Sequence, residues 1–144
     1  MTMKGRKDMS DQDYYNVKLR NCGGVPVIEL IGELNEAALS RIESVMRSLA
    51  DAGHYHLVVN LRKAVGANLK ALNSLRNTIA RIRSHHGMVD LVAEAGQARE
   101  LRSMESLSGL LRVNPSEAHA IRKIKRLLRL PDDSVAGTSA RLTE

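Results

Sequence analysis

Apolar positions along the chain switch repeatedly between two periods. Alternation, or a short continuous apolar run, is typical of strands, whereas apolar residues three and four apart indicate a helix. Five segments are predicted to be strands: 15–20, 25–31, 56–61, 88–93 and the short 110–113. The glycines of Asn21-Cys-Gly-Gly24 accept the positive φ of a tight turn, so the first two strands are expected to form an antiparallel hairpin.

Helical patterns occupy most of the chain between and after these strands. The predicted helices are about 36–52, 69–86, 97–108 and 117–130. Asn35, Asn68 and Ser116 precede three of them and are preferred N-cap residues. The apolar residues of the last helix that are expected to face the core are Ala118, Ile121, Ile124, Leu127 and Leu128.

This order of elements predicts the fold class. Strands that alternate with helices form a mostly parallel sheet with right-handed crossovers. We therefore expect an α/β fold with a four- or five-stranded, mostly parallel sheet, an N-terminal antiparallel hairpin and four helices. A single domain is expected at 14–130. The N-terminal segment (1–13) and the C-terminal tail (131–144) are expected to be flexible, because both are polar and show no periodic spacing of apolar residues.

The amino-acid composition limits the kinds of core and of functional site that the chain can form. The chain has 144 residues, no Phe or Trp and three Tyr, so its core must be aliphatic and few side chains can stack on bases. Cys22 is the only cysteine, which excludes an internal disulfide and a cysteine-based zinc site. There is no apolar run long enough for a membrane span and no apolar signal core, so a cytoplasmic protein without a metal or other cofactor is expected.

Positive charge is concentrated in two stretches. The formal net charge is +6, and residues 52–89 contain no Asp or Glu. The basic residues of that stretch are Arg62, Lys63, Lys70, Arg76, Arg81 and Arg83, and a second group is Arg122, Lys123, Lys125, Arg126 and Arg129. Such surfaces suit an acidic protein, a phosphate or anionic lipid, although a solvated helix face is the simpler interpretation.

Four motifs, taken in order, resemble the STAS family of anti-sigma-factor antagonists over about residues 15–128. They are Val27-Ile-Glu-Leu-Ile-Gly-Glu-Leu34, Leu57-Val-Val-Asn-Leu61, Gly87-Met-Val-Asp-Leu-Val92 and Leu110-Leu-Arg-Val-Asn-Pro-Ser-Glu-Ala118. The resemblance implies a partner-binding module. In the family's typical members a serine at the start of the second helix is phosphorylated, and the added charge breaks the complex.

The chain departs from the family at that switch. The motif that is usually Asp-Ser-Ser-Gly-Leu aligns with Asn68-Leu-Lys-Ala-Leu72, so Leu69 stands at the position of the phosphorylated serine. Asn60 likewise replaces the Asp that usually ends the preceding strand. No phosphorylation is expected, and Ser74 is the nearest substitute hydroxyl.

Rival functions have weaker support. His54, His56, His85 and His86 suggest metal or acid–base chemistry only by their number, since no carboxylate or nucleophile accompanies them in sequence, and catalysis is not expected. Nucleic-acid or phosphate-ligand binding through the basic surface of 62–83 is the alternative. A membrane-surface role for the last helix is disfavoured, because the core is expected to need its apolar residues.

The sequence therefore predicts a non-enzymatic regulatory module that binds a protein partner through the face around the start of the second helix. That partner is expected to have an acidic face and to be an anti-sigma factor, a histidine-kinase-like ATPase or a sensor. The predicted binding residues are Arg62, Lys63, Asn68, Leu69, Lys70, Asn73 and Arg76. Leu69 is either an exposed apolar anchor or a core residue, and the cations would steer the acidic partner.

Overall fold

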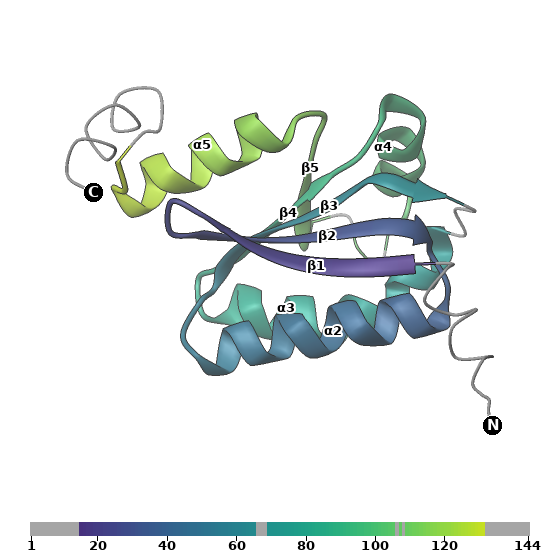
Figure 1. Ribbon diagram of the computed structural model, residues 1–144, viewed down its shortest axis with the longest axis horizontal. Coiled ribbons are helices and arrows are strands. Elements are labelled where there is room, and N and C mark those ends of the chain that lie inside the picture. Colours follow the sequence, from purple (N-terminus) through teal and green to yellow (C-terminus); the bar gives the residue numbers. More distant parts are fainter. Residues whose placement is uncertain (1–14, 66–68, 106, 108, 132–144) are drawn as a thin grey trace.

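A five-stranded mixed sheet forms the centre of the molecule (Figure 1). The computed structural model describes residues 15–65, 69–105, 107 and 109–131. The strands lie in the order β1-β2-β3-β4-β5, with β1 and β2 antiparallel and the other neighbours parallel. This confirms the predicted α/β fold with an antiparallel hairpin at its N-terminal side.

The hairpin consists of β1 (Tyr15–Cys22) and β2 (Val25–Glu33), each slightly longer than predicted. Gly23 and Gly24 both have positive φ, and the side chain of Asn21 accepts a hydrogen bond from the Gly24 backbone N–H at 2.7 Å. The tight turn follows from these residue types, as the sequence indicated.

Three parallel strands complete the sheet: β3 (His56–Val65), β4 (Met88–Val92) and β5 (Leu111–Asn114). β3 extends four residues beyond its predicted end. Its register against β2 shifts, since Glu29 pairs with Asn60 but Ile31 pairs with Lys63. This β-bulge places two consecutive residues of β3 on the same side of the sheet.

Helices cover both faces of the sheet (Figure 1). α2 (Glu36–Asp51) begins at the predicted cap Asn35, whose side chain accepts a hydrogen bond from the Ala38 N–H at 2.8 Å. α2 and α3 (Arg76–Ser84) lie on one side, which we call the inner face, and α5 (Glu117–Leu128) lies on the other, the outer face. α4 (Ala95–Arg102) packs beside β5.

The second predicted helix is divided in two. A 3₁₀-helix, η1 (Leu69–Leu75), precedes α3. The α-helix therefore begins at Arg76 and not at the predicted Leu69. Asn68 itself lies outside the described residues, and its expected capping role stays a prediction. Leu69, Leu72 and Leu75 are buried, because a 3₁₀ spacing of three keeps these residues on one face.

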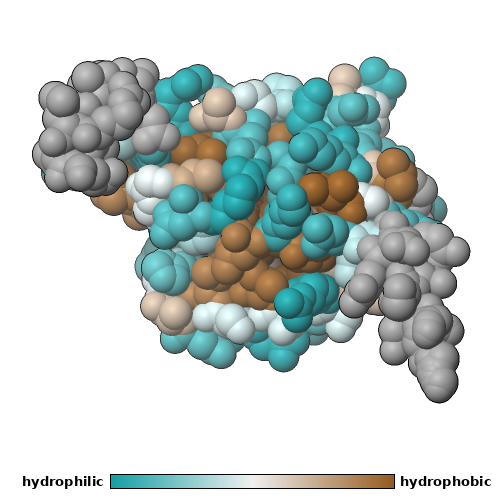
Figure 2. Space-filling view, viewed as in Figure 1, coloured by the Kyte–Doolittle hydropathy of each residue, from teal (hydrophilic) through white to brown (hydrophobic). Residues whose placement is uncertain are grey.

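Alternate residues of the central strands feed two separate cores. On the inner face, Leu57, Val59 and Leu61 pack with residues of α2, η1 and α3 in a large aliphatic cluster. The outer cluster is small and is made of Val25, Val27, Val58, Val92, Ala120 and Ile124. Figure 2 shows that apolar side chains also reach the surface along the seam between β1 and α2.

The prediction for the inward side of the last helix was partly wrong. Ile124 is buried and Ile121 is half-buried, but Ala118 is exposed and Leu127 and Leu128 are 59% and 41% exposed. At the first turn of the helix, Glu117 is held by residues of β1 and β3. The apolar spacing continues to Leu127 and Leu128, but Leu130, which follows them, is the residue that packs on the outer cluster and on Gly24.

Candidate functional site

The predicted binding residues are divided between the two faces of the sheet. Leu69, Lys70 and Asn73 belong to η1, which packs with α2 and α3 on the inner side, and Arg76 begins α3. Lys70, Asn73 and Arg76 are exposed, whereas Leu69 is only 1% exposed. Leu69 is therefore a core residue, which decides between the two alternatives that the sequence left open.

Arg62 and Lys63 lie on the outer side, beyond the N-terminal end of α5. The bulge in β3 explains this placement, because Leu61 and Ala64 both pack in the inner cluster and the two residues between them turn outward. The structure thus brings Arg62 and Lys63 together, but it separates them from Lys70, Asn73 and Arg76. Whether either group binds a partner stays a prediction.

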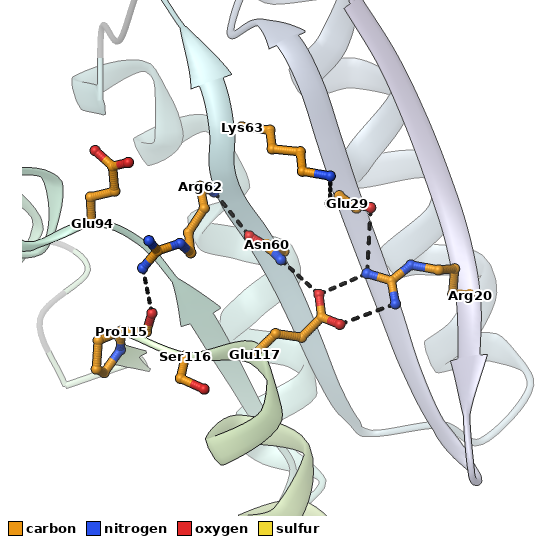
Figure 3. Close-up of a pocket in the computed structure, with 9 residues that line it drawn as sticks. All are labelled: Arg20, Glu29, Asn60, Arg62, Lys63, Glu94, Pro115, Ser116 and Glu117. Carbon is orange, nitrogen blue, oxygen red and sulfur yellow. Dashed lines mark hydrogen bonds and ion pairs between the residues drawn. The ribbon is translucent and has the colours of Figure 1, made fainter.

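An open cleft of about 810 Å³ surrounds Arg62 and Lys63 (Figure 3). It lies where the sheet extends past the first turn of α5, so its floor comes from strands and one wall comes from the β5–α5 connection. The lining residues are Arg20, Glu29, Asn60, Arg62, Lys63, Glu94, Pro115, Ser116 and Glu117. Three cations and three carboxylates therefore share one polar depression.

Glu117 is the centre of a hydrogen-bonded network in the cleft. Arg20 of β1 donates to both carboxylate oxygens of Glu117, at 3.0 and 2.7 Å, and Asn60 of β3 donates to one of them at 2.6 Å. The Arg20 guanidinium holds the pKa of Glu117 below its ordinary value, against the opposing effect of burial. The same pairing raises the pKa of Arg20. Glu117 is thus a tightly held carboxylate that ties α5 to two strands.

Glu29 links Lys63 to this network. Its carboxylate lies 3.4 Å from Arg20 and 3.5 Å from Lys63. Arg62 instead donates to the backbone carbonyl of Pro115 at 2.6 Å, while its own N–H donates to the Asn60 side chain at 2.9 Å. Because Arg62 and Lys63 are exposed, their charges can meet an acidic group on another molecule.

Sequence reasoning missed Arg20 and Glu29 and gave Glu117 only a helix-entry role. A signal was present, since Glu29 interrupts the apolar run of β2 and is 8% exposed. A charged residue inside a buried strand is rare unless it is paired. Its partners Arg20 and Lys63 come from neighbouring strands, and only the sheet order identifies them.

The histidines that suggested metal chemistry lie around the start of β3 and the end of α3. Within the part of the chain that the structure describes, there is no group of three or more His, Cys, Asp or Glu side chains that could hold a metal ion. His85 stacks on Tyr55 with ring centroids 4.4 Å apart. Burial lowers the pKa of His56, and the nearby Arg112 lowers it further.

The fold is similar to that of anti-sigma factor antagonists, which agrees with the predicted STAS-like fold. One similar structure is an anti-sigma factor antagonist from Mycobacterium paratuberculosis, with a TM-score of 0.60, 15% identity and coverage of 78% of this chain and 96% of that one. The unphosphorylated anti-sigma factor antagonist SpoIIAA also has a TM-score of 0.60, with 14% identity and coverage of 78% and 96%. Phosphorylated SpoIIAA, described as a Bacillus cell fate determinant, has a TM-score of 0.58, 15% identity and coverage of 76% and 98%.

Comparisons at the level of sequence give no match. No family model matches the chain, and no curated protein matches it significantly. The likeness to solved structures therefore establishes the fold alone. Among the described residues, no helix has the length and apolar character that crossing a membrane requires.

Proposed function

We propose that this chain is a non-enzymatic, cytoplasmic regulatory module that binds another protein, as the name anti-sigma factor antagonist implies for its structural neighbours. The observation that carries the proposal is the shared fold, which extends over 78% of the chain and nearly all of the neighbouring structures. By this analogy the partner is an anti-sigma factor, a histidine-kinase-like ATPase or a sensor with an acidic face.

We also propose that binding is not controlled by the usual serine phosphorylation. Leu69, which aligns with the phosphorylated serine, is a buried side chain without a hydroxyl. The substitute Ser74 is exposed but lines a groove together with Glu36 and Glu43. A phosphate placed there would be repelled by these carboxylates, which supports Ser74 as an unmodified residue.

Exposed cations near the start of the second helical segment are the proposed contact with the partner. Lys70 is the best position to test, since it is exposed and lies at the start of η1, directly after the buried Leu69. Arg83, at the other end of α3, provides a control with the same change of charge. Its guanidinium contacts the Gly87 carbonyl at 3.3 Å.

The experiment is affinity capture from the native host with the wild type, Lys70→Glu and Arg83→Glu. We expect a regulatory protein to be recovered by the wild type and Arg83→Glu and to be lost with Lys70→Glu, because reversal of charge opposes an acidic partner. Equal recovery by all three variants would show that the chosen face is wrong. Intact-mass measurement of the captured chain should show no phosphate, and a phosphate on Ser74 would contradict the switchless model.

The alternative of nucleic-acid or phosphate binding by residues 62–83 has less support from the geometry. Arg81 pairs with Asp51 at 2.7 Å, and Lys63 pairs with Glu29, so part of the positive charge is already compensated. If the captured material were nuclease-sensitive and salt-sensitive, with no protein common to replicate captures, this alternative would replace the first proposal.

A further inference from the structure

A small groove lies beside α4, next to the cleft. It has a volume of about 320 Å³, and four residues of α4 form one of its walls. The opposite wall is Pro115, which also lines the cleft around Arg62 (Figure 3). Ala93 and Pro115 directly follow β4 and β5, so the groove is at the carboxyl ends of two parallel strands. Crevices in this position are where open α/β sheets commonly bind other molecules.

The lining of the groove combines small apolar side chains with two cations. Counted from Ala95, the other lining residues of α4 follow after three, four and seven positions, which places all four on one side of the helix. Ala98 is only 6% exposed, whereas both arginines are exposed. The full set is Ala93, Ala95, Ala98, Arg99, Arg102 and Pro115. The groove therefore has an apolar floor with positive charge at its rim.

The charges of the two arginines are available to another molecule. In the part of the chain that the structure describes, neither Arg99 nor Arg102 forms an ion pair with an acid. Glu100 is one residue from Arg99 and two from Arg102, and side chains so spaced on a helix do not face each other. Glu94 lines the neighbouring cleft and belongs to the capping box that begins α4. The groove itself is thus cationic.

We propose that this groove binds an acidic segment of a protein partner. One small apolar side chain of the segment would rest on the alanines, while carboxylates on either side of it meet Arg99 and Arg102. The volume is near the lower limit for small-molecule sites and suits a side chain better than a whole ligand. A nucleic acid fits less well, because the groove's lining includes no aromatic side chain on which a base could stack.

This inference rests on the proposed function for the class of partner, an acidic protein, but it assigns a contact on α4 that does not involve Lys70. The two can therefore fail separately. If the groove bound no acidic peptide while Lys70→Glu still abolished capture of the partner, only the inference about the groove would be wrong. If the groove bound such a peptide and capture did not depend on Lys70, the proposed face around η1 would be wrong.

The test is a titration of the isotope-labelled full-length chain, followed through its backbone amide NMR signals. The probe is a blocked pentapeptide with one valine between two pairs of acidic residues. We expect saturable shifts concentrated in residues 93–102 and 115–117. A peptide with serine in place of the valine should bind about threefold or more weakly, since it loses apolar contact. Absence of saturable shifts at the groove would overturn the proposal, as would tighter binding of a single-stranded oligonucleotide there.

Paired charge variants test the role of the arginines. Arg99→Gln/Arg102→Gln is expected to lower the affinity for the acidic peptide about fivefold or more. The control Arg122→Gln/Arg126→Gln removes the same charge from two exposed arginines of α5, also one turn apart, and should change the affinity less than about twofold. Equal losses in both double variants would show nonspecific attraction and refute the proposal.

A second pair of variants tests the shape of the groove without changing its charge. Ala95→Leu adds bulk at an exposed position of the lining and should weaken peptide binding severalfold. Ala37→Leu makes the same change at an exposed alanine in the first turn of α2 and should have no effect. Unchanged binding by Ala95→Leu would place the peptide elsewhere and contradict the proposal. The dispersion of each variant's amide signals shows whether the fold is intact.

Discussion

The two faces of the sheet are built on different principles. The inner face is covered by α2, η1 and α3 over a large aliphatic cluster, and the buried Thr78 of α3 donates to Glu43 of α2 at 2.9 Å. The outer face is covered by α5, where the six-residue outer cluster is joined only by the partly buried Cys22, Ile121 and Leu130. Where that cluster ends, the strands present Arg20, Glu29 and Asn60 to the cleft.

We infer from this difference that the inner face mainly contributes stability and that the outer face provides the polar groups for recognition. An aliphatic interior stabilises in proportion to the area it buries and offers no specific chemistry. Charged side chains inside a protein must be paired, and the outer face provides the pairs: Glu117 with Arg20, and Asp90 with Arg112. We therefore expect damage to the inner face to unfold the domain and damage to the outer face to affect α5 and the cleft.

Equivalent truncations on the two faces provide the largest expected contrast. Ile42 and Ile124 are both fully buried, the first in the inner cluster and the second in the outer one. Ile42→Ala is expected to lower the free energy of unfolding by about 3–5 kcal/mol and Ile124→Ala by about 2–3 kcal/mol, because the smaller cluster can relax around the cavity. Chemical denaturation measures both values.

Hydrogen exchange sharpens the same comparison. Ile42→Ala should accelerate amide exchange throughout the domain, whereas Ile124→Ala should accelerate it mainly in α5. If both variants gave the same pattern of exchange, the two faces would form one cooperative unit and the contrast would be wrong.

The buried ion pair between β4 and β5 is expected to give the next largest effect. Asp90 is completely buried, and Arg112 donates to its two oxygens at 2.6 and 3.0 Å. Arg112→Met should destabilise the protein by about 3 kcal/mol, since it leaves a buried carboxylate without compensation. The double variant Asp90→Asn/Arg112→Met should recover part of this loss, and a double variant no more stable than the single one would argue against the pairing as the cause.

The network around Glu117 should have the smallest effect and a dependence on pH. Glu117→Gln is expected to lower the free energy of unfolding by about 1–2 kcal/mol at neutral pH, since Arg20 is partly exposed and solvent screens the pair. The folded-state pKa of Glu117 lies below the ordinary value of 4.5, so its contribution is present above that pH and is lost as the pH falls through the folded value.

Denaturation of the wild type and Glu117→Gln across acidic pH measures this difference. The two stabilities should converge as the wild-type carboxylate is protonated. Glu100→Gln on the exposed side of α4 is the control and should show no such convergence. If the difference in free energy of unfolding between the two proteins stayed constant down to strongly acidic pH, the charge of Glu117 would not be its cause.

Sequence reasoning was most reliable where one local pattern decides the outcome. The hairpin, the Asn35 cap and the burial of Leu57, Val59 and Leu61 follow from turn chemistry and from the spacing of apolar residues. The exposed ends of α5 could not be predicted this way, because the pattern places Leu127 and Leu128 on the inward side whether or not a sheet lies beneath them. Leu130, which follows the helix, is the residue that packs on the outer cluster.

The cleft was equally inaccessible to local reasoning. Arg20, Asn60 and Glu117 lie far apart in sequence and meet only because β1, β2 and β3 are neighbours and α5 crosses them. Arg62 and Lys63 were selected for their charge, which is a local property. Arg62 faces outward by regular alternation, and Lys63 joins it there because of the bulge in β3, which the sequence did not reveal.

That bulge also has a consequence for how the chain can evolve. Leu61 and Ala64 face the inner core on either side of Arg62 and Lys63, so the strand contains one residue more than regular alternation requires. Loss of a single codon here would remove one cation and leave a regular strand, with both flanking core residues still in place. Deletion of one residue at this point can thus lower the positive charge of the cleft by one without repacking the interior.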